Sequence, residues 1–368
     1  MNHFHTRLAQ LKEILASYKY PVPFSEHLKF YFSKHKNAGS KDRREIRALS
    51  YAYFRISHAL EGETIDKIAE YAVNLIENEG PIEDFINTIP EFKADQIFPF
   101  GQYVSEPFHN REFQLSFLAQ PRVWIKIAPG KIKDVMAELN SLEIVFEIYE
   151  DEVLSFGPEI SLTALKSYSI GYFRIQDLSS QTVCKTFNPS AGENWWDCCA
   201  GSGGKSLALM EQQPGINLYA SDIRESILNN LAQRHTQAST GKINIFAADL
   251  SQTGVERKLP PMDGIIVDAP CSGSGTWARN PENLHYFNAE AIAEYQSRQL
   301  AILKNVYPFL KHGKPLIYIT CSVFTMENEE VINQFTAQHS LEIEDQKYIK
   351  GYEHGAENMF LCRMIKTA

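Results

Sequence analysis

The stretch GIIVDAPCSGSGT, residues 264–276, decides the fold predicted for this chain. Its first part, residues 264–267, is a short run of apolar and β-branched residues, which is typical of a buried parallel strand. Asp268 ends the run, and ligands of open α/β sheets bind just beyond the carboxyl ends of such strands. We therefore expect Asp268 to face a cleft, with Cys271 close to it. Taken alone, the stretch fits equally well a turn after a core strand, in which Cys271 is a small buried hydrophobic residue.

A second apolar run that ends in a cysteine favours the functional interpretation. Residues 316–319 (LIYI) are followed directly by Thr320, Cys321 and Ser322. Two thiols at the tips of two strands, with a carboxylate beside one of them, indicate thiolate chemistry rather than packing. The sequence therefore predicts an α/β protein whose sheet has a reactive edge.

Both cysteine segments resemble motifs of one enzyme family. Residues 268–271 (DAPC) resemble the Asp-Ala-Pro-Cys motif, and residues 320–322 (TCS) the Thr-Cys-Ser motif, of the RsmB/Nop/Sun RNA cytosine-5 methyltransferases. The resemblance covers roughly residues 115–368. It implies a Rossmann-like class I methyltransferase sheet, S-adenosylmethionine as the methyl donor and RNA as the substrate.

The same resemblance implies different roles for the two thiols. Carbon 5 of cytosine is too electron-poor to attack a methyl group, but a thiolate that adds to carbon 6 turns the ring into an enamine that can. The resemblance assigns this addition to Cys321 and product release to Cys271, with Asp268 at ring nitrogen N3 and Lys205 beside it. The Pro-Cys context of Cys271 would favour that thiol as the nucleophile instead, by analogy with DNA cytosine methyltransferases.

A glycine-rich turn predicts the cofactor site. Residues 195–206 (WWDCCAGSGGKS) run from a strand through this turn into a helix, whose free N–H groups can receive a carboxylate. Only two residues separate Gly201 from Gly204, whereas a phosphate loop needs four between its first glycine and its Gly-Lys pair. The family's first motif, Cys-Ala-Ala-Pro-Gly-Gly-Lys, is matched at Cys199, Ala200, Gly203, Gly204 and Lys205, while Gly201 and Ser202 replace its Ala-Pro.

Acidic residues at two further strand ends complete the predicted cofactor pocket. Asp222 follows the run LYAS, where an acid accepts hydrogen bonds from ribose hydroxyls or, alternatively, caps the next helix. Asp249 stands at the place expected for the adenine. The arginine that the family often has five residues after the ribose acid is Ile227 here. Residues 327–329 (ENE) resemble the family's segment and are expected to cap the helix that follows Cys321.

Three domains are expected in 368 residues. Helical spacing of apolar residues predicts an all-helical domain over 1–105, which resembles the NusB-like extension of some family members. A β-α-β-β-α-β pattern predicts a ferredoxin-like, RNA-recognition-type module over 106–175, and 176–368 is the methyltransferase domain. Eight Lys and Arg residues stand against three acids between positions 26 and 60. This excess indicates either a solvated helix face or, as we favour, a surface that contacts RNA phosphates.

The overall composition is that of a globular protein without a membrane segment. The net charge of −9 indicates that any RNA-binding face is a local patch. The six cysteines show no Cys-x-x-Cys spacing, so no metal is expected. Free thiols, and the absence of a signal peptide or a bilayer-length apolar run, lead us to expect a cytoplasmic monomer.

Three other functions are alternatives to RNA cytosine-5 methylation. An amino-group methyltransferase uses Asn/Asp-Pro-Pro-Tyr, which residues 268–271 fit poorly. A DNA cytosine methyltransferase fits Pro270-Cys271 but neither the second cysteine motif nor the ferredoxin-like module. A non-catalytic RNA-binding or assembly protein is disfavoured because the acids and both thiols are intact. Ribosomal RNA is the expected substrate and transfer RNA the alternative.

Overall fold

The computed structural model describes residues 4–367 except 37, 159, 239–240 and 253–257. These residues form two compact units. One unit consists of residues 1–120 with 276–289, and the other of residues 121–275 with 290–368. The first unit thus includes a short segment from the part of the chain predicted as methyltransferase domain. The predicted domain limits at 105/106 and 175/176 stay predictions.

A seven-stranded sheet organises the second unit, in the order β10-β11-β9-β8-β5-β6-β7. The five strands from β9 to β7 are parallel, and β11 and β10 continue the sheet antiparallel at one edge. The strands are β5 (Asn194–Asp197), β6 (Asn217–Asp222), β7 (Lys242–Ala247), β8 (Gly264–Asp268), β9 (Pro315–Thr320), β10 (Leu341–Ile349) and β11 (Met359–Lys366). After β7 the chain returns to the other side of β5, so the strand order reverses between β5 and β8. Ligands bind at such a switch point.

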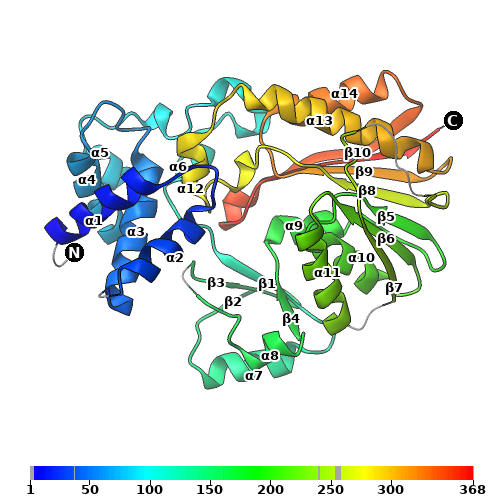
Figure 1. Ribbon diagram of the computed structural model, residues 1–368, viewed down its shortest axis with the longest axis horizontal. Coiled ribbons are helices and arrows are strands. Elements are labelled where there is room, and N and C mark those ends of the chain that lie inside the picture. Colours follow the sequence, from blue (N-terminus) through cyan, green and yellow to red (C-terminus); the bar gives the residue numbers. More distant parts are fainter. Residues whose placement is uncertain (1–3, 37, 159, 239–240, 253–257, 368) are drawn as a thin grey trace. The chain divides into compact units, whose positions relative to one another are not determined.

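Helices cover both faces of this sheet, as Figure 1 shows. Alternate residues of a strand point to opposite faces, so Ile265 and Val267 join the core under α13 and α14, whereas Ile266 joins the core under α9 and α10. The helices are α9 (Leu178–Cys184), α10 (Gly204–Gln212), α11 (Glu225–Ala238), α13 (Ala291–Val306) and α14 (Glu329–Thr336), with short 3-10 turns η4 (Ser274–Thr276), η5 (Tyr307–Phe309), η6 (Thr325–Glu327) and η7 (Gly351–His354). The predicted Rossmann-like methyltransferase sheet is confirmed.

A four-stranded antiparallel sheet of order β2-β3-β1-β4 precedes it in the chain. Its elements are β1 (Val123–Ile127), α7 (Ile132–Ser141), β2 (Glu147–Glu150), β3 (Val153–Phe156), α8 (Lys166–Ser169) and β4 (Phe173–Ile175). This is the ferredoxin-like order. Ile125 and Ile127 pack under α7 on one face, while Trp124 on the other face packs against Leu178 and Ala356, which belong to the part of the chain with the seven-stranded sheet.

The first unit is built from helices. They are α1 (Phe4–Ser17), α2 (Phe24–Lys34), α3 (Ser40–Ile56), α4 (Ile65–Glu77), α5 (Ile82–Asn87), α6 (Arg111–Ser116) and α12 (Pro281–Tyr286), with 3-10 turns η1 (Ala94–Gln96), η2 (Gly101–Tyr103) and η3 (Glu106–Phe108). Arg55, counted above among the basic residues, is buried and donates hydrogen bonds to the carbonyls of Phe117, Ala119 and Ala278. It therefore supports the fold and does not belong to a phosphate-binding surface.

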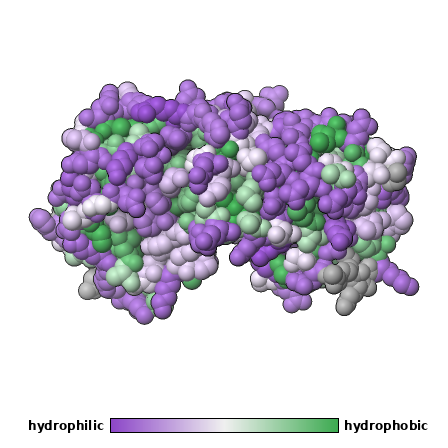
Figure 2. Space-filling view, turned by 90° about the horizontal axis from the view of Figure 1, so that it is seen from above, coloured by the Kyte–Doolittle hydropathy of each residue, from purple (hydrophilic) through white to green (hydrophobic). Residues whose placement is uncertain are grey.

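Figure 2 shows one side of the molecule, on which hydrophilic residues dominate and hydrophobic ones form small separate groups. Among the described residues, no helix is long and apolar enough to cross a membrane.

Candidate active site

The structure places the two predicted catalytic thiols against each other. Cys271 follows β8, Cys321 follows the neighbouring strand β9, and their Sγ atoms lie 3.3 Å apart. The backbone N–H of Gly275 donates to the Cys321 carbonyl at 2.8 Å. A Cβ at position 275 would lie 2.3 Å from the Asn358 carbonyl oxygen, so only glycine allows this close approach. The hydrogen bond to Cys321, together with burial, raises the pKa of the Cys271 thiol well above its usual value. Cys271 therefore keeps its proton at neutral pH.

A buried carboxylate ties the two cysteine loops together. The Glu327 carboxylate accepts three hydrogen bonds from the two loops. The backbone N–H (2.8 Å) and the hydroxyl (2.5 Å) of Ser272 donate to it, and so does the Ser322 hydroxyl (2.5 Å). Gln299 of α13 donates to the same carboxylate at 3.1 Å. Burial raises the pKa of Glu327, although these donors offset part of the effect. Each serine is the neighbour of one thiol, so Glu327 fixes both loops at once.

The prediction that residues 327–329 cap the helix after Cys321 is wrong. Helix α14 begins at Glu329, and the preceding Asn328 makes no side-chain cap hydrogen bond. Its side chain instead accepts from the Thr320 hydroxyl at 2.6 Å and donates to the Ser322 carbonyl at 2.9 Å. The Asn328 side chain turns away from the helix end because the neighbouring Thr320–Ser322 segment has buried polar groups that need partners.

Lys205 and Asp268 form an ion pair across the switch point. Lys205 lies in the first turn of α10 after β5, and its Nζ is 2.6 Å from the Asp268 carboxylate at the end of β8. Burial alone would lower the pKa of Lys205, but the Asp268 charge outweighs burial, so the pKa is raised. The lysine therefore stays charged, next to the carboxylate that precedes the Cys271 loop.

The glycine turn and Asp222 also lie together. The Gly201 N–H donates to the Asp222 carboxylate at 3.0 Å. Gly203 has φ 86°, and a Cβ there would lie 2.1 Å from Leu231 Cδ1, so the turn requires glycine. Asp222 also pairs with Arg224, whose Nε lies 3.0 Å from it, and this offsets burial and lowers the pKa of Asp222. The sequence reasoning missed Arg224, which stands two residues after a predicted ribose acid.

The remaining predicted acid, Asp249, has a local partner. Asp249, two residues after β7, accepts from the backbone N–H (3.0 Å) and the hydroxyl (2.6 Å) of Ser251. Because β7 runs parallel to β6, Asp249 lies at the same carboxyl edge of the sheet as the other acids.

Asp197 is a buried acid that the sequence reasoning also missed. It ends β5 under the glycine turn and accepts a hydrogen bond from the Ser206 hydroxyl at 2.6 Å. Its other carboxylate oxygen is buried and has no partner among the described residues. Burial raises its pKa from 3.8 to about 7. Only its position before two cysteines and a glycine turn could have pointed to it.

Comparisons with known proteins agree with this geometry. Residues 184–365 match a family model described as 16S rRNA methyltransferase RsmB/F. A probable ribosomal RNA small subunit methyltransferase B of Synechocystis sp. is 31% identical over 229 residues, which cover 61% of this chain and 51% of that protein. Ribosomal RNA small subunit methyltransferase B of Yersinia pestis bv. Antiqua (strain Angola) is 32% identical over 245 residues, 66% of this chain and 52% of that protein. The chain thus spans about half the length of these relatives.

Solved structures share the fold at low sequence identity. PH0851 superposes with a TM-score of 0.71 and 18% identity, covering 99% of this chain and 98% of that one. NSun6 from Pyrococcus horikoshii, solved with SFG, gives a TM-score of 0.62 and 15% identity over 69% of this chain and 93% of that one. The chain therefore belongs, through residues 184–365, to the RsmB/Nop/Sun family, as its two cysteine motifs predicted.

Proposed function

We propose that this chain methylates carbon 5 of a cytosine in ribosomal RNA, with S-adenosylmethionine as the methyl donor. The observation that carries the proposal is the pair of thiols at 3.3 Å at the carboxyl edge of two neighbouring parallel strands. Amino-group methylation has no use for such a pair, because the exocyclic nitrogen can attack a methyl group without covalent activation. Family membership and the named relatives support the same chemistry.

The cofactor pocket is proposed at residues 199–205, Asp222, Asp249 and Asp268. A turn with φ of 53° at Gly201 and 86° at Gly203 leaves its backbone open to close approach by a ligand. The Asp222 carboxylate stands beside this turn, which suits a nucleoside with two ribose hydroxyls. S-adenosylmethionine, when bound, supplies an electrophilic methyl group on a sulfonium.

The proposed roles of the two thiols are those that the family resemblance implies. Cys321 as thiolate adds to carbon 6 of the base, and a bond forms from carbon 5 to the methyl group while the donor sulfur takes the electron pair. The carbon 5 proton must then leave so that the Cys321–carbon 6 bond can break. Cys271 is proposed to take this proton: its raised pKa keeps it protonated at rest, so its own proton must first pass to solvent, and the resulting thiolate is a strong base. Asp268 faces ring nitrogen N3, and Lys205 balances its charge.

The experiment compares three alanine variants in methyl transfer from labelled S-adenosylmethionine to small-subunit ribosomal RNA and to transfer RNA. Cys321→Ala should be inactive without a covalent species. Cys271→Ala should accumulate a ribonuclease-sensitive protein–RNA adduct on a denaturing gel, because the base is attacked but not released. Cys362→Ala removes a buried thiol of the same sheet and should transfer methyl groups without an adduct.

Each outcome separates one part of the proposal. An adduct in Cys321→Ala and none in Cys271→Ala would make Cys271 the nucleophile. Label on transfer RNA alone would replace ribosomal RNA as the substrate. Wild-type protein that binds RNA but transfers no label to either would favour a non-catalytic binding protein.

A further inference from the structure

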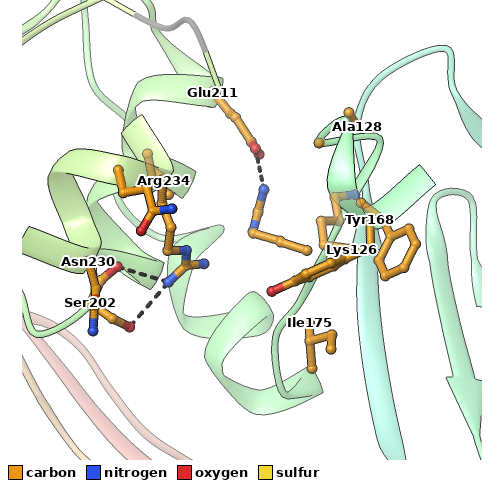
Figure 3. Close-up of a pocket in the computed structure, with 13 residues that line it drawn as sticks. Lys126, Ala128, Tyr168, Ile175, Ser202, Glu211, Asn230 and Arg234 are labelled. Atoms are coloured by element: carbon orange, nitrogen blue, oxygen red, sulfur yellow. Dashed lines mark hydrogen bonds and ion pairs between the residues drawn. The ribbon is translucent and has the colours of Figure 1, made fainter. Parts of the chain in front are cut away.

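A polar groove lies between the ferredoxin-like sheet and helices α10 and α11, within the second unit. It has a volume of about 540 Å³ and lies away from the thiols. In Figure 3, Lys126, Tyr168 and Ile175 face it from the ferredoxin-like side, and Ser202 and Arg234 from the methyltransferase side. We call this hollow the module groove.

The charge of the module groove favours an anion. Its lining carries three cations, Lys126, Arg174 and Arg234, against one carboxylate, Glu211, in a chain of net charge −9. Glu211 is already paired with Arg174, and Lys126 pairs with Glu152 at 3.1 Å. Two guanidinium groups therefore face one hollow with a single carboxylate between them.

Arg234 is the cation that most needs a counter-ion. Its guanidinium donates to the Ser202 carbonyl (2.8 Å) and hydroxyl (3.1 Å), and no ion pair joins it to any carboxylate in the described part of the chain. Burial lowers its pKa; the nearby Tyr168 offsets part of this effect, and the positive charge of Arg174 adds to it. A half-buried cation next to another cation is stabilised when an anion enters the groove.

The groove also offers a flat apolar surface beside these charges. The Tyr168 side chain is 37% exposed and the Ile175 side chain 40% exposed. Asn230 and Gln233 of α11 add amide donors and acceptors to the opposite wall. A guanidinium for a phosphate, a ring for a base and amides for base edges together match one nucleotide of a single strand.

We propose that the module groove binds a single-stranded segment of the RNA substrate, with a phosphate at Arg234 and a base stacked on Tyr168. This inference rests on the proposed function, because it gives the same RNA a second contact outside the target-base site. Arg234 holds Ser202 of the glycine turn, so the bound strand touches a residue that fixes the proposed cofactor loop. RNA in the groove and S-adenosylmethionine in the pocket are therefore expected to bind cooperatively.

The test measures binding of a fluorescein-labelled 12-nucleotide oligouridine, which contains no target cytosine, by fluorescence anisotropy. Asn230→Asp places a negative charge in the groove and removes no hydrogen bond found among the described residues, whereas Asn229→Asp places the same charge one residue earlier on α11, outside the lining. We expect Asn230→Asp to weaken RNA binding roughly threefold to tenfold at low salt, and Asn229→Asp less than twofold.

Tyr168→Ala tests the stacking surface. It should weaken RNA binding about 5- to 150-fold, the range for losing one base–aromatic stack. Tyr149→Ala is its control, because Tyr149, on β2 of the same ferredoxin-like module, is a comparably exposed ring (43%) outside the groove. S-adenosylmethionine affinity of Tyr168→Ala, measured alone by calorimetry, should equal that of the wild type, which also verifies folding.

The readout keeps this inference separate from the proposed function. Equal RNA affinity of Asn230→Asp and Asn229→Asp, together with wild-type affinity of Tyr168→Ala, would overturn the groove while methyl transfer by the wild type continued. If both groove variants, Asn230→Asp and Tyr168→Ala, bind RNA more weakly but the wild-type protein transfers no methyl group, the proposed function is overturned and the groove is supported.

Discussion

Asp197→Asn is expected to stabilise the protein increasingly as the pH rises. Burial raises the pKa of Asp197 from 3.8 to about 7. The unfolded chain therefore ionises at this position near pH 3.8, while the folded chain keeps the proton until about pH 7. Stability from this group is fully present below pH 3.8 and is lost as the pH rises to 7, at about 1.4 kcal/mol per pH unit.

The structure sets the magnitude of the effect. Asparagine keeps an acceptor for the Ser206 hydroxyl, now 2.6 Å from the carboxylate, and carries no charge that must be buried. Between pH 5 and pH 8 the wild type should lose about 2.5 kcal/mol of unfolding free energy that the variant keeps. The assay is urea unfolding at pH 5, 6, 7 and 8, followed by the fluorescence of Trp195 and Trp196, which are buried in the same strand.

Asp263→Asn is the matched control for the pH series. Burial would raise the pKa of Asp263, but Lys311 at 2.8 Å and other donors outweigh it and lower the pKa. Its stabilising effect is thus present above pH 3.8 and lost only in acid, so this variant should be destabilised by the same amount from pH 5 to pH 8. The reasoning would be refuted if the difference in unfolding free energy between Asp197→Asn and the wild type changed by less than about 0.5 kcal/mol from pH 5 to pH 8.

Three further predictions follow from the site and the helical unit. Asp222→Ala should weaken S-adenosylmethionine binding by about 1–3 kcal/mol, because buried donors lose their acceptor; calorimetry with wild-type affinity would remove Asp222 from the pocket. Glu327→Ala should lower the free energy of unfolding by about 2–4 kcal/mol and should also lower methyl transfer, since both thiol loops lose their shared acceptor. Glu329→Ala, which loses a hydrogen bond from Tyr348, should cost less, and equal costs would contradict the role of Glu327 in joining the two loops. Charge-neutral variants at four N-terminal positions, Lys41, Arg43, Arg44 and Arg47, should each reduce the slope of log RNA affinity against log salt concentration by about 0.7–0.9. An unchanged slope would show that these residues form a solvated helix face.

The N-terminal unit shows how far residue counting reaches. Eight basic residues between positions 26 and 60 predicted a positive surface, yet Arg55 is buried and donates to three carbonyls. Arg7, from outside that window, pairs with Asp42 and Glu45, so two of the three acids there are neutralised within the fold. The number of charges is a property of the sequence, but their exposure depends on which helices pack together.

The sequence by itself determined the sheet and the edge at which its motifs meet. Asp222 and Asp268, predicted to end strands, are the last residues of β6 and β8, and the strands predicted before the glycine turn and at the Cys321 motif are β5 and β9. Parallel strands bring their carboxyl ends to one edge, so local patterns at separate places in the chain were enough to predict one shared site.

Only the tertiary structure decided how the side chains at that edge pair with one another. The 3.3 Å contact of Cys271 with Cys321 and the pairing of Lys205 with Asp268 join residues 50 and 63 positions apart. Glu327 accepts hydrogen bonds beside both thiols instead of capping a helix, and Asp197 has a raised pKa because it is fully buried. Periodicity reports the repeat of a strand or helix, whereas these partners depend on loop paths and on burial, which exist only once the whole sheet has packed.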